Sequence, residues 1–205
     1  MKVYFVRHAE SKLGAAGMHQ VESTGLSETG IKQAKILAKR FSRIPIDFIL
    51  CSSHQRAKQT AAIINQSLKK PIEFTPFLAE IRRPTEIQEK KAGDLEAVEI
   101  KGLIKKHYHE RNWRYSDEET FDDLVERSKK VIDLILNLKK ENILVVTHGM
   151  IMRMIVPMMI LGGLTPEMFL KLNESVKISN TGITLCEFEG NRWILITWND
   201  HTHLG

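Results

Sequence analysis

An arginine–histidine pair, Arg7 and His8, follows a short apolar run near the start of the chain. A second histidine, His148, ends another apolar run, 143–147, far along the sequence. Such runs predict buried strands, and in an open α/β sheet ligands bind beyond the carboxyl ends of the parallel strands. We therefore expect the two histidines and the arginine to meet in one crevice and to bind an anion there, phosphate first.

The residues after a further apolar run, 47–51, add to this predicted anion site. Arg56 falls in the first turn of the helix expected after Ser52 and Ser53. A helix N-terminus offers free backbone N–H groups and a positive dipole end, and a guanidinium can bind two phosphate oxygens. Arg56 is therefore a second candidate phosphate ligand. His54 could line the same pocket or could cap the helix.

Predicted strands and helices alternate along the chain. Strands are expected at 2–6, 47–51, 72–74 and 142–147, and helices at 26–41, 56–68, 121–138 and 150–161. Two further strands, 184–188 and 193–198, flank a turn at 189–192. This alternation predicts an α/β fold, a three-layer α/β/α sandwich. Its sheet should be mostly parallel, with an antiparallel edge made by the C-terminal hairpin.

One stretch, 81–119, does not fit the alternation. It is rich in charge, and a weak apolar stripe predicts helical content, made by Leu95, Val98, Leu103 and Ile104. We expect residues 1–205 to form a single domain in which this stretch is an insertion folded over one edge of the sheet. An insertion between two strand ends can act as a lid over a site.

The composition excludes several classes of protein. The formal net charge of +5 is mild and no basic and aromatic stripe is present, so nucleic acid is not an expected partner. The most apolar stretch, 150–164, is interrupted by Arg153 and Pro157 and is too short to span a bilayer, so we expect no membrane association. Because this stretch is rich in methionine, we expect it to form a helix in the core. No signal peptide is evident. Cys51 and Cys186 are expected to be buried and reduced, which indicates a cytoplasmic protein.

Four motifs together resemble the histidine phosphatase superfamily, the phosphoglycerate mutase-like proteins, and specifically its phosphatase branch. They are Val6-Arg7-His8-Ala9-Glu10, then Gly25-Leu26-Ser27-Glu28-Thr29-Gly30 with Gln33-Ala34, then Ser52-Ser53 to Arg56-Ala57 with Gln59-Thr60-Ala61, and Thr147-His148-Gly149. Each motif alone is weak. All four occur in the family's order and cover nearly the whole chain, and unrelated chains rarely match such a set.

The resemblance implies a metal-independent phosphomonoesterase that acts through a phosphohistidine. His8 matches the nucleophile, whereas Arg7, Arg56 and His148 match the phosphate pocket, and we count His148 among the catalytic residues. Glu80 follows the third strand, in the place of the general acid that protonates the leaving alkoxide and then activates water. The implied substrate is a small phosphorylated metabolite, and no metal or other cofactor is implied.

The chain departs from the family pattern close to the predicted site. Many members have an asparagine several residues after the nucleophile, but the comparable segment, 14–17, has none, and Ser11 is expected to substitute in part. After the general acid, the run Ile81-Arg82-Arg83-Pro84 replaces the family's glycine and aromatic residue. We hypothesise that Arg82 and Arg83 bind a second anionic group of the substrate. The alternative is a pair of solvated charges.

Other polar residues have simpler interpretations. Glu118 and Glu119 are weaker candidates for the general acid. Arg153 is expected to form a salt bridge or to bind backbone carbonyls. Two His-x-His pairs, at 107–109 and 201–203, have a spacing that could hold a metal, but no cysteine or carboxylate accompanies them at a suitable distance in sequence. Surface histidines are therefore expected there, not a metal site.

Three other functions stay open beside the phosphatase. A phosphoglycerate-type mutase must guard its phosphoenzyme from water, and the chain lacks the longer enclosing segments that we associate with cofactor-dependent mutases. A phosphohistidine protein phosphatase needs an open site, which the insertion should narrow. A catalytically silent binding module is disfavoured because all four core residues are present. The C-terminal hairpin edge could pair with a second chain, so a homodimer is possible.

Overall fold

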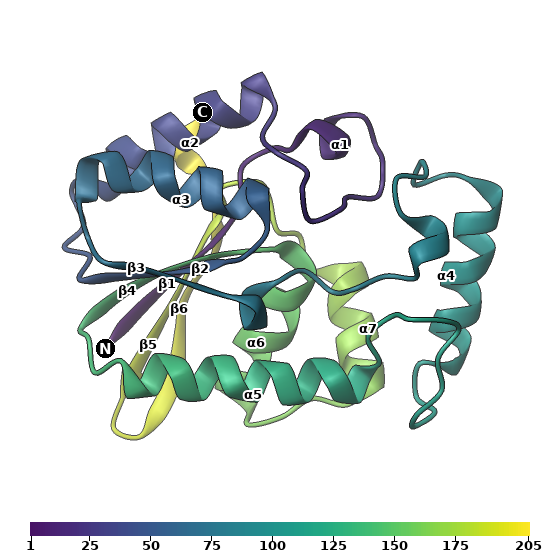
Figure 1. Cartoon of the computed structure of the whole chain (residues 1–205). Coiled ribbons are helices and arrows are strands. Elements are labelled where there is room, and N and C mark those ends of the chain that lie inside the picture. Colours follow the sequence, from purple (N-terminus) through teal and green to yellow (C-terminus); the bar gives the residue numbers. More distant parts are fainter.

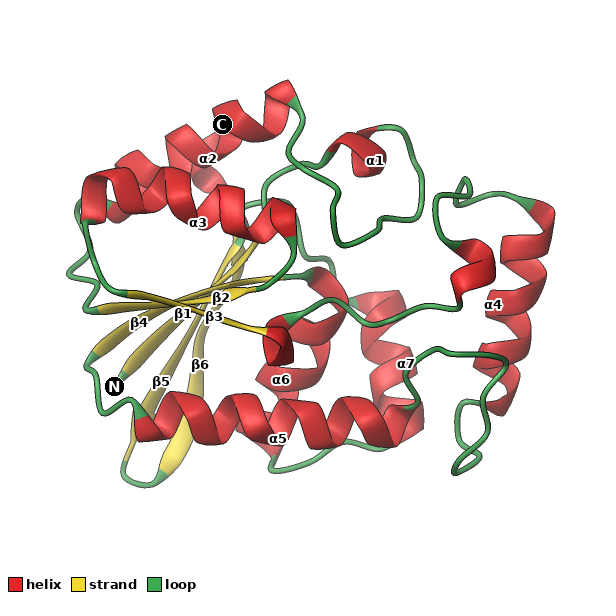
Figure 2. Cartoon of the chain, viewed as in Figure 1, coloured by secondary structure: helices red, strands yellow, loops and turns green.

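The computed structural model describes residues 1–205 and shows a six-stranded mixed sheet between two layers of helices (Figures 1 and 2). The strands are β1 (Lys2–Arg7), β2 (Phe48–Ser52), β3 (Ile72–Thr75), β4 (Asn142–Thr147), β5 (Ile183–Glu189) and β6 (Arg192–Asp200). Their order is β3-β2-β4-β1-β5-β6. The first four pair in parallel, while β5 pairs antiparallel with both β1 and β6. The predicted α/β/α sandwich with an antiparallel C-terminal hairpin is confirmed.

Helices cover both faces of this sheet. They are α1 (Lys12–Ala15), α2 (Glu28–Phe41), α3 (Gln55–Leu68), α4 (Leu95–His107), α5 (Phe121–Asn137), α6 (Gly149–Leu161) and α7 (Pro166–Ser175). Figure 1 shows α2 and α3 on one face, with α5 and α6 on the other. The short α1 and α7 were not predicted, although α7 has a clear start signal. Thr165 caps it by accepting from the Met168 N–H, and Pro166 occupies the first turn, where no N–H is needed.

Each face of the sheet is buried in its own apolar core. Along β4, Ile143 and Val145 pack with α5 and α6, whereas Leu144 and Val146 pack with α2 and α3. Burial on both faces explains why the parallel strands are continuous apolar runs in the sequence. The core helix prediction is confirmed by four buried methionines of α6, namely Met152, Met154, Met158 and Met159. The two cysteines are buried and unpaired, as predicted.

We expected the insertion, 81–119, to fold over one edge of the sheet, but it does not. Figure 1 shows α4 beyond the carboxyl ends of the parallel strands, well away from the edge strands β3 and β6. Helix α4 instead packs on a neighbouring part of the insertion, because Ala97 and Ile100 bury themselves against Ile87. The prediction that four residues of α4 form one apolar stripe is wrong, because three of them are exposed: Leu95, Val98 and Leu103.

Candidate active site

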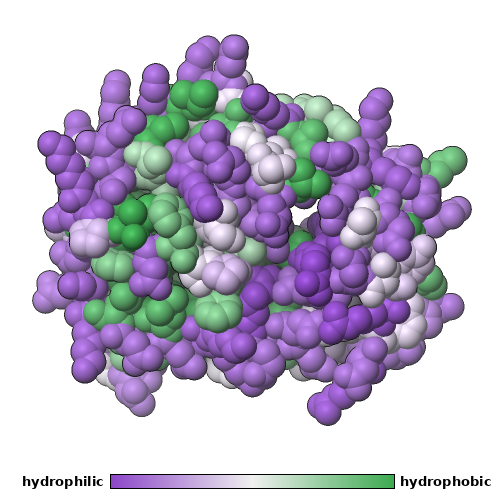
Figure 3. All heavy atoms as spheres, viewed as in Figure 1, coloured by the Kyte–Doolittle hydropathy of each residue, from purple (hydrophilic) through white to green (hydrophobic).

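Side chains from the carboxyl ends of the parallel strands meet at one cavity of about 700 Å³. Arg7 ends β1 and His8 follows it, while Arg56 lies in the first turn of α3 after β2, and Glu80 follows β3. Because these strands are parallel neighbours, their ends lie on the same side of the sheet. Figure 3, which has the side view of Figure 1, shows an opening bordered by hydrophilic residues and by some hydrophobic ones. The predicted crevice is therefore present.

The buried ring of His8 is held in one tautomer. Its Nδ1 lies 2.7 Å from the carbonyl oxygen of Ala9, which can only accept, so Nδ1 carries the proton. Its Nε2 lies 3.2 Å from Nε of Arg56, which can only donate, so Nε2 keeps its lone pair. Burial, together with the charges of Arg56 and Arg7, holds the pKa of His8 well below its ordinary value. At neutral pH the ring is uncharged, with one nucleophilic nitrogen beside a guanidinium.

The backbone on either side of this ring is also fixed. His8 donates its N–H to the carbonyl of Thr147 at 2.9 Å and accepts, at its own carbonyl, from Nδ2 of Asn180 at 2.9 Å. The N–H of the buried Ala9 donates to Oγ1 of Thr60 at 3.1 Å. Asn180 received no role from the sequence, because nothing near it repeats the motif pattern. These bonds, made by Thr147, Asn180 and Thr60, hold His8 in position from three segments that are distant in the sequence.

Arg7 and Arg56 supply positive charge next to His8. The guanidinium of Arg56 is almost fully buried, donates to the carbonyl of Val21 at 3.0 Å, and has its pKa lowered to about 10 by burial. Arg7 donates through Nη1 to the carbonyl of Ile178 at 2.6 Å, and its buried Nε has no partner. Both arginines are thus anchored by backbone carbonyls and keep further donors for an anion.

His148 does not line the cavity but lies directly behind it. Its ring centroid is 5.0 Å from that of His8 and 4.9 Å from that of His54. Its Nε2 is 2.8 Å from Oγ of Ser52, and the Ser52 hydroxyl hydrogen has no other acceptor within hydrogen-bond distance, so it points to Nε2. The proton of this neutral ring is then on Nδ1, a buried donor with no partner. Such a donor beside His8 suits an anionic oxygen.

The structure does not place Ser11 at the phosphate site. Its hydroxyl accepts from the Gly14 N–H, which caps α1, and donates to Oε1 of Gln20 at 2.8 Å. This bond leaves the amide nitrogen of Gln20, a residue that lines the cavity, free to donate there. Glycine at position 14 leaves room for this contact, because a Cβ there would lie 2.8 Å from the Ser11 hydroxyl and 3.0 Å from the Gln20 amide nitrogen. Gln20, which the sequence reasoning missed, is therefore a lining residue with an amide donor near the predicted phosphate site.

The carboxylate of Glu80 lies at the N-terminus of α6 and lines the cavity. Oε1 accepts from the backbone N–H groups of Ile81, Met150 and Ile151, at 3.0, 3.1 and 3.2 Å. Oε2 accepts a further bond from Met150 at 3.2 Å. The positive end of the α6 dipole therefore faces this carboxylate and fixes its orientation.

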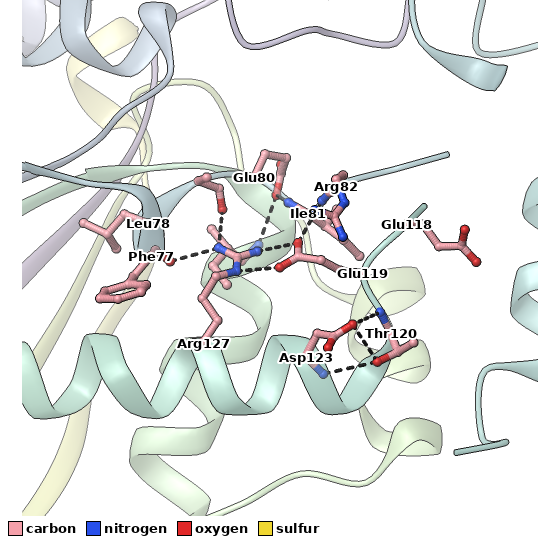
Figure 4. Close-up of polar contacts among 12 residues, drawn as sticks. Phe77, Leu78, Glu80, Ile81, Arg82, Glu118, Glu119, Thr120, Asp123 and Arg127 are labelled. Atoms are coloured by element: carbon pink, nitrogen blue, oxygen red, sulfur yellow. Dashed lines mark hydrogen bonds and ion pairs between the residues drawn. The ribbon is translucent and has the colours of Figure 1, made fainter. Parts of the chain in front are cut away.

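The two competing carboxylates are used in structural contacts. Glu118 is buried, does not line the cavity, and accepts from the N–H groups of Tyr115 and Ser116. Glu119 lines the cavity but is paired with Arg127, as Figure 4 shows beside Glu80. Among the three, Glu80 is the carboxylate that reaches the cavity without a cation as its partner.

Arg82, Arg83 and His54, the three residues expected on the substrate side, all line the cavity. Arg82 is tied to the base of the insertion, because its Nε donates to the Asp117 carbonyl at 2.5 Å. Arg83 makes no hydrogen bond or ion pair. Its charge adds to burial in lowering the pKa of His19, another lining residue that was not predicted, to about 4. His54 makes no capping bond to α3 and lies 3.5 Å from a carboxylate oxygen of Glu22.

Arg153 binds a backbone carbonyl, as predicted. Arg153 donates through Nε and Nη2 to the carbonyl of Val176, at 2.9 and 2.8 Å. His107 pairs with Glu110 and stacks on Trp113, and no cluster of histidines, cysteines and carboxylates with metal-binding geometry is present. No helix has the length and apolar composition needed to cross a bilayer.

Known proteins resemble the chain over almost its full length. A family model of the histidine phosphatase superfamily (branch 1) matches residues 3–201. A metal-independent phosphoserine phosphatase of Arabidopsis thaliana is 27% identical, covering 99% of this chain and 83% of that protein. A probable phosphatase of Schizosaccharomyces pombe is 31% identical, covering 100% and 95%. Probable phosphoglycerate mutases are also among the relatives. The crystal structure of alpha-ribazole phosphatase from Shigella flexneri superimposes with a TM-score of 0.83 at 21% identity, covering 98% and 96%.

Proposed function

The chain belongs to the histidine phosphatase superfamily, and from this premise we propose that it hydrolyses small phosphate monoesters through a phosphohistidine at His8. The observation that carries this proposal is the single tautomer of His8. Its Nδ1–H is bound to a carbonyl, and its Nε2 lone pair lies beside Arg56. A neutral imidazole with one unprotonated nitrogen, in a pocket with two arginines, is suited to attack phosphorus.

The reaction proceeds in two steps. Nε2 of His8 attacks phosphorus while the bond from phosphorus to the alcohol oxygen breaks, and protonated Glu80 gives its proton to that oxygen. Water then attacks the phosphohistidine, Glu80 takes the proton from the water, and the P–N bond breaks to release inorganic phosphate. Arg7 and Arg56 neutralise charge on the equatorial oxygens throughout.

An uncharged donor completes the proposed phosphate pocket. The free amide of Gln20 supplies a hydrogen bond to a phosphate oxygen. Because the two arginines neutralise the charge of the phosphoryl group and this amide stabilises it further, the proposed reaction uses no metal. The name of the Arabidopsis relative, a metal-independent phosphatase, supports this assignment.

The experiment that tests the proposal measures phosphate release from an aryl phosphate in the presence of EDTA. The wild type should release phosphate, and His8→Ala should not. Brief mixing of the wild type with radiolabelled substrate should trap a label that acid removes and base does not, as expected for phosphohistidine. Release by His8→Ala at the wild-type rate would overturn the assignment of the nucleophile.

On the substrate side we propose that Arg83 binds a second anionic group. Arg83 is the better candidate of the predicted pair, because Arg82 is committed to the Asp117 carbonyl whereas Arg83 is unpaired. Phosphoserine, named for the Arabidopsis relative, carries such a group. Arg83→Ala should lower kcat/KM for phosphoserine more than for phosphoethanolamine, which lacks the carboxylate. Equal losses for both esters would remove Arg83 from this role.

A mutase remains the second candidate, because probable phosphoglycerate mutases are among the relatives. Incubation with 3-phosphoglycerate distinguishes the two, since a mutase yields 2-phosphoglycerate whereas a phosphatase yields glycerate and phosphate.

We also propose a cytoplasmic location, which the two unpaired, buried cysteines support. The exposed Leu195 and Ile196 of the edge strand β6 support pairing with a second copy, which sedimentation would test.

A further inference from the structure

A second cavity, of about 260 Å³, lies between the insertion and α7. We call it the rear chamber. Most of its surface is apolar, formed on the insertion side by Pro84, Ile87 and Ile104, and on the α7 side by Phe169 and Leu170. Charged side chains line the rest, among them Arg83, Lys101 and Glu118. An ion pair between Lys105 of α4 and Glu174 of α7 links the two sides near its outer end. A cavity of about 150 Å³ can hold benzene, so this chamber has room for a substituted aromatic ring.

Two buried polar atoms in the wall of the rear chamber have no hydrogen-bond partner. They are the hydroxyl of Tyr108 and Oδ1 of Asn173. Burial raises the pKa of Tyr108, so its hydroxyl stays protonated and remains a donor. Buried polar groups are almost always satisfied in folded proteins, so an unsatisfied donor and acceptor in one chamber indicate a missing polar group of a ligand. A hydroxyl group can satisfy both atoms, because it accepts and donates.

The rear chamber shares part of its wall with the active-site cavity. Five residues line both cavities, namely Ile81, Arg82, Arg83, Glu119 and Met150. Ile81 follows Glu80 in the chain, and Ile81 and Met150 both donate backbone N–H groups to the Glu80 carboxylate. Figure 4 shows Ile81 beside Glu80, above α5. Ile81 and Met150 therefore connect the proposed general acid to the rear chamber.

We infer that the rear chamber binds the alcohol part of the substrate, and that this alcohol is larger than serine, with an apolar body and a hydroxyl group at its far end. The inference rests on the proposed phosphatase function, since it assigns the leaving group of that reaction. The phosphate lies at His8, the alcohol passes Ile81 and Met150, and its apolar body displaces water from the chamber. Its terminal hydroxyl pairs with Tyr108 and Asn173.

The test compares three phosphate esters of primary alcohols. They are ethyl phosphate, 2-phenylethyl phosphate and the 4-hydroxy derivative of 2-phenylethyl phosphate. Their leaving groups are chemically alike, so differences in kcat/KM report the binding of the ring and its hydroxyl. We expect kcat/KM of the wild type to rise about tenfold or more from the ethyl to the phenylethyl ester, because the ring is buried. The 4-hydroxyl should add about twofold to tenfold.

Variants then assign these gains to the rear chamber. Leu170→Trp fills the chamber and should remove the preference for the ring while leaving ethyl phosphate hydrolysis unchanged. Lys171→Trp is the matched control, because Lys171 is exposed on the same helix and does not line the chamber. Tyr108→Phe should remove only the gain from the 4-hydroxyl.

Other results of these experiments would overturn the assignment of the rear chamber or the proposed function. An active wild type that hydrolyses the ethyl and phenylethyl esters equally well overturns the assignment of the chamber. So does a ring preference that Leu170→Trp leaves intact. A wild type that hydrolyses none of the three esters, and no aryl phosphate either, overturns the proposed function and this inference with it. The two failures are therefore distinguishable.

Discussion

The guanidinium of Arg127 on α5 holds the carboxylate of Glu119 through two hydrogen bonds of 2.7 Å, from Nε to Oε1 and from Nη2 to Oε2 (Figure 4). Nη1 of the same arginine donates to the carbonyls of Phe77 and Ala79, at 2.9 and 2.7 Å. Glu119 also exchanges two hydrogen bonds with the backbone of Arg82. One arginine therefore joins both ends of the insertion to the segment that carries the proposed general acid.

Replacing Arg127 should destabilise the protein and disturb the reaction. Arg127→Met leaves the Glu119 carboxylate, only 13% exposed, without its cation, so we expect a loss of about 3 kcal/mol in the free energy of unfolding. Urea unfolding measures this loss. The double variant Arg127→Met, Glu119→Met removes the unpaired charge and should recover part of the stability. If the double variant is no more stable than the single one, the ion pair is not the cause.

Substitution of the two carboxylates should separate catalysis from structure. Glu80→Gln removes the transferable proton, so kcat for an alkyl phosphate should fall by a factor of about 10² to 10⁴. The loss should be smaller for p-nitrophenyl phosphate, whose leaving group needs no proton. Glu119→Gln should lower the unfolding midpoint but keep most of kcat. A larger kcat loss in Glu119→Gln than in Glu80→Gln would exchange their assigned roles.

Gln20 should contribute to phosphate binding. Gln20→Leu removes the amide donor, and we expect KM for any phosphate ester, and Ki for inorganic phosphate, to rise about tenfold. Ser11→Ala keeps the amide but removes the hydroxyl that orients it, so its effect should be smaller and in the same direction. Steady-state kinetics on one ester measures both. An unchanged Ki for phosphate in Gln20→Leu would show that the amide makes no such contact.

The buried histidines should make the protein less stable in acid. Burial, with nearby charges, holds the pKa values of His8 and His148 well below the usual value of about 6.5. Below that pH the unfolded chain binds protons that the folded protein does not, so acid favours unfolding. Stability should be flat above about pH 7 and then fall, with each ring contributing up to about 1.4 kcal/mol per pH unit. Urea unfolding from about pH 7.5 to 5.5 tests this, and His148→Asn should reduce the slope.

A glycine in α2 should be irreplaceable for steric reasons. A Cβ on Gly30 would lie 2.0 Å from the carbonyl oxygen of Glu10, so Gly30→Ala must push apart α2 and the segment that follows His8. We expect a loss of a few kcal/mol, of the size found for overpacked sites. Gly102→Ala in α4 is the control, since nothing lies near its Cβ, and it should stabilise by about 0.5–1 kcal/mol. Thermal unfolding of both variants checks the opposite signs.

Much of the site could be predicted because it lies at strand ends. Arg7, His8 and Arg56 each follow or end a run whose apolar pattern identifies a buried strand, and parallel topology brings such ends together. The insertion was harder to predict. Its helix α4 packs on Ile87 within the insertion itself, so its apolar residues do not point to the main core. Periodicity alone does not distinguish these two packings.

The sequence by itself determined the order of the elements, the sandwich they form, the family, and the charged residues that gather at one end of the sheet. These follow from local periodicity and from the geometry of parallel strands. Only the tertiary structure decided the tautomer of His8, the placement of Ser11 away from the cavity with Gln20 in its stead, and the position of His148 behind the cavity. Those features depend on hydrogen bonds between segments far apart in the chain, whose partners are set by how the layers and loops pack together.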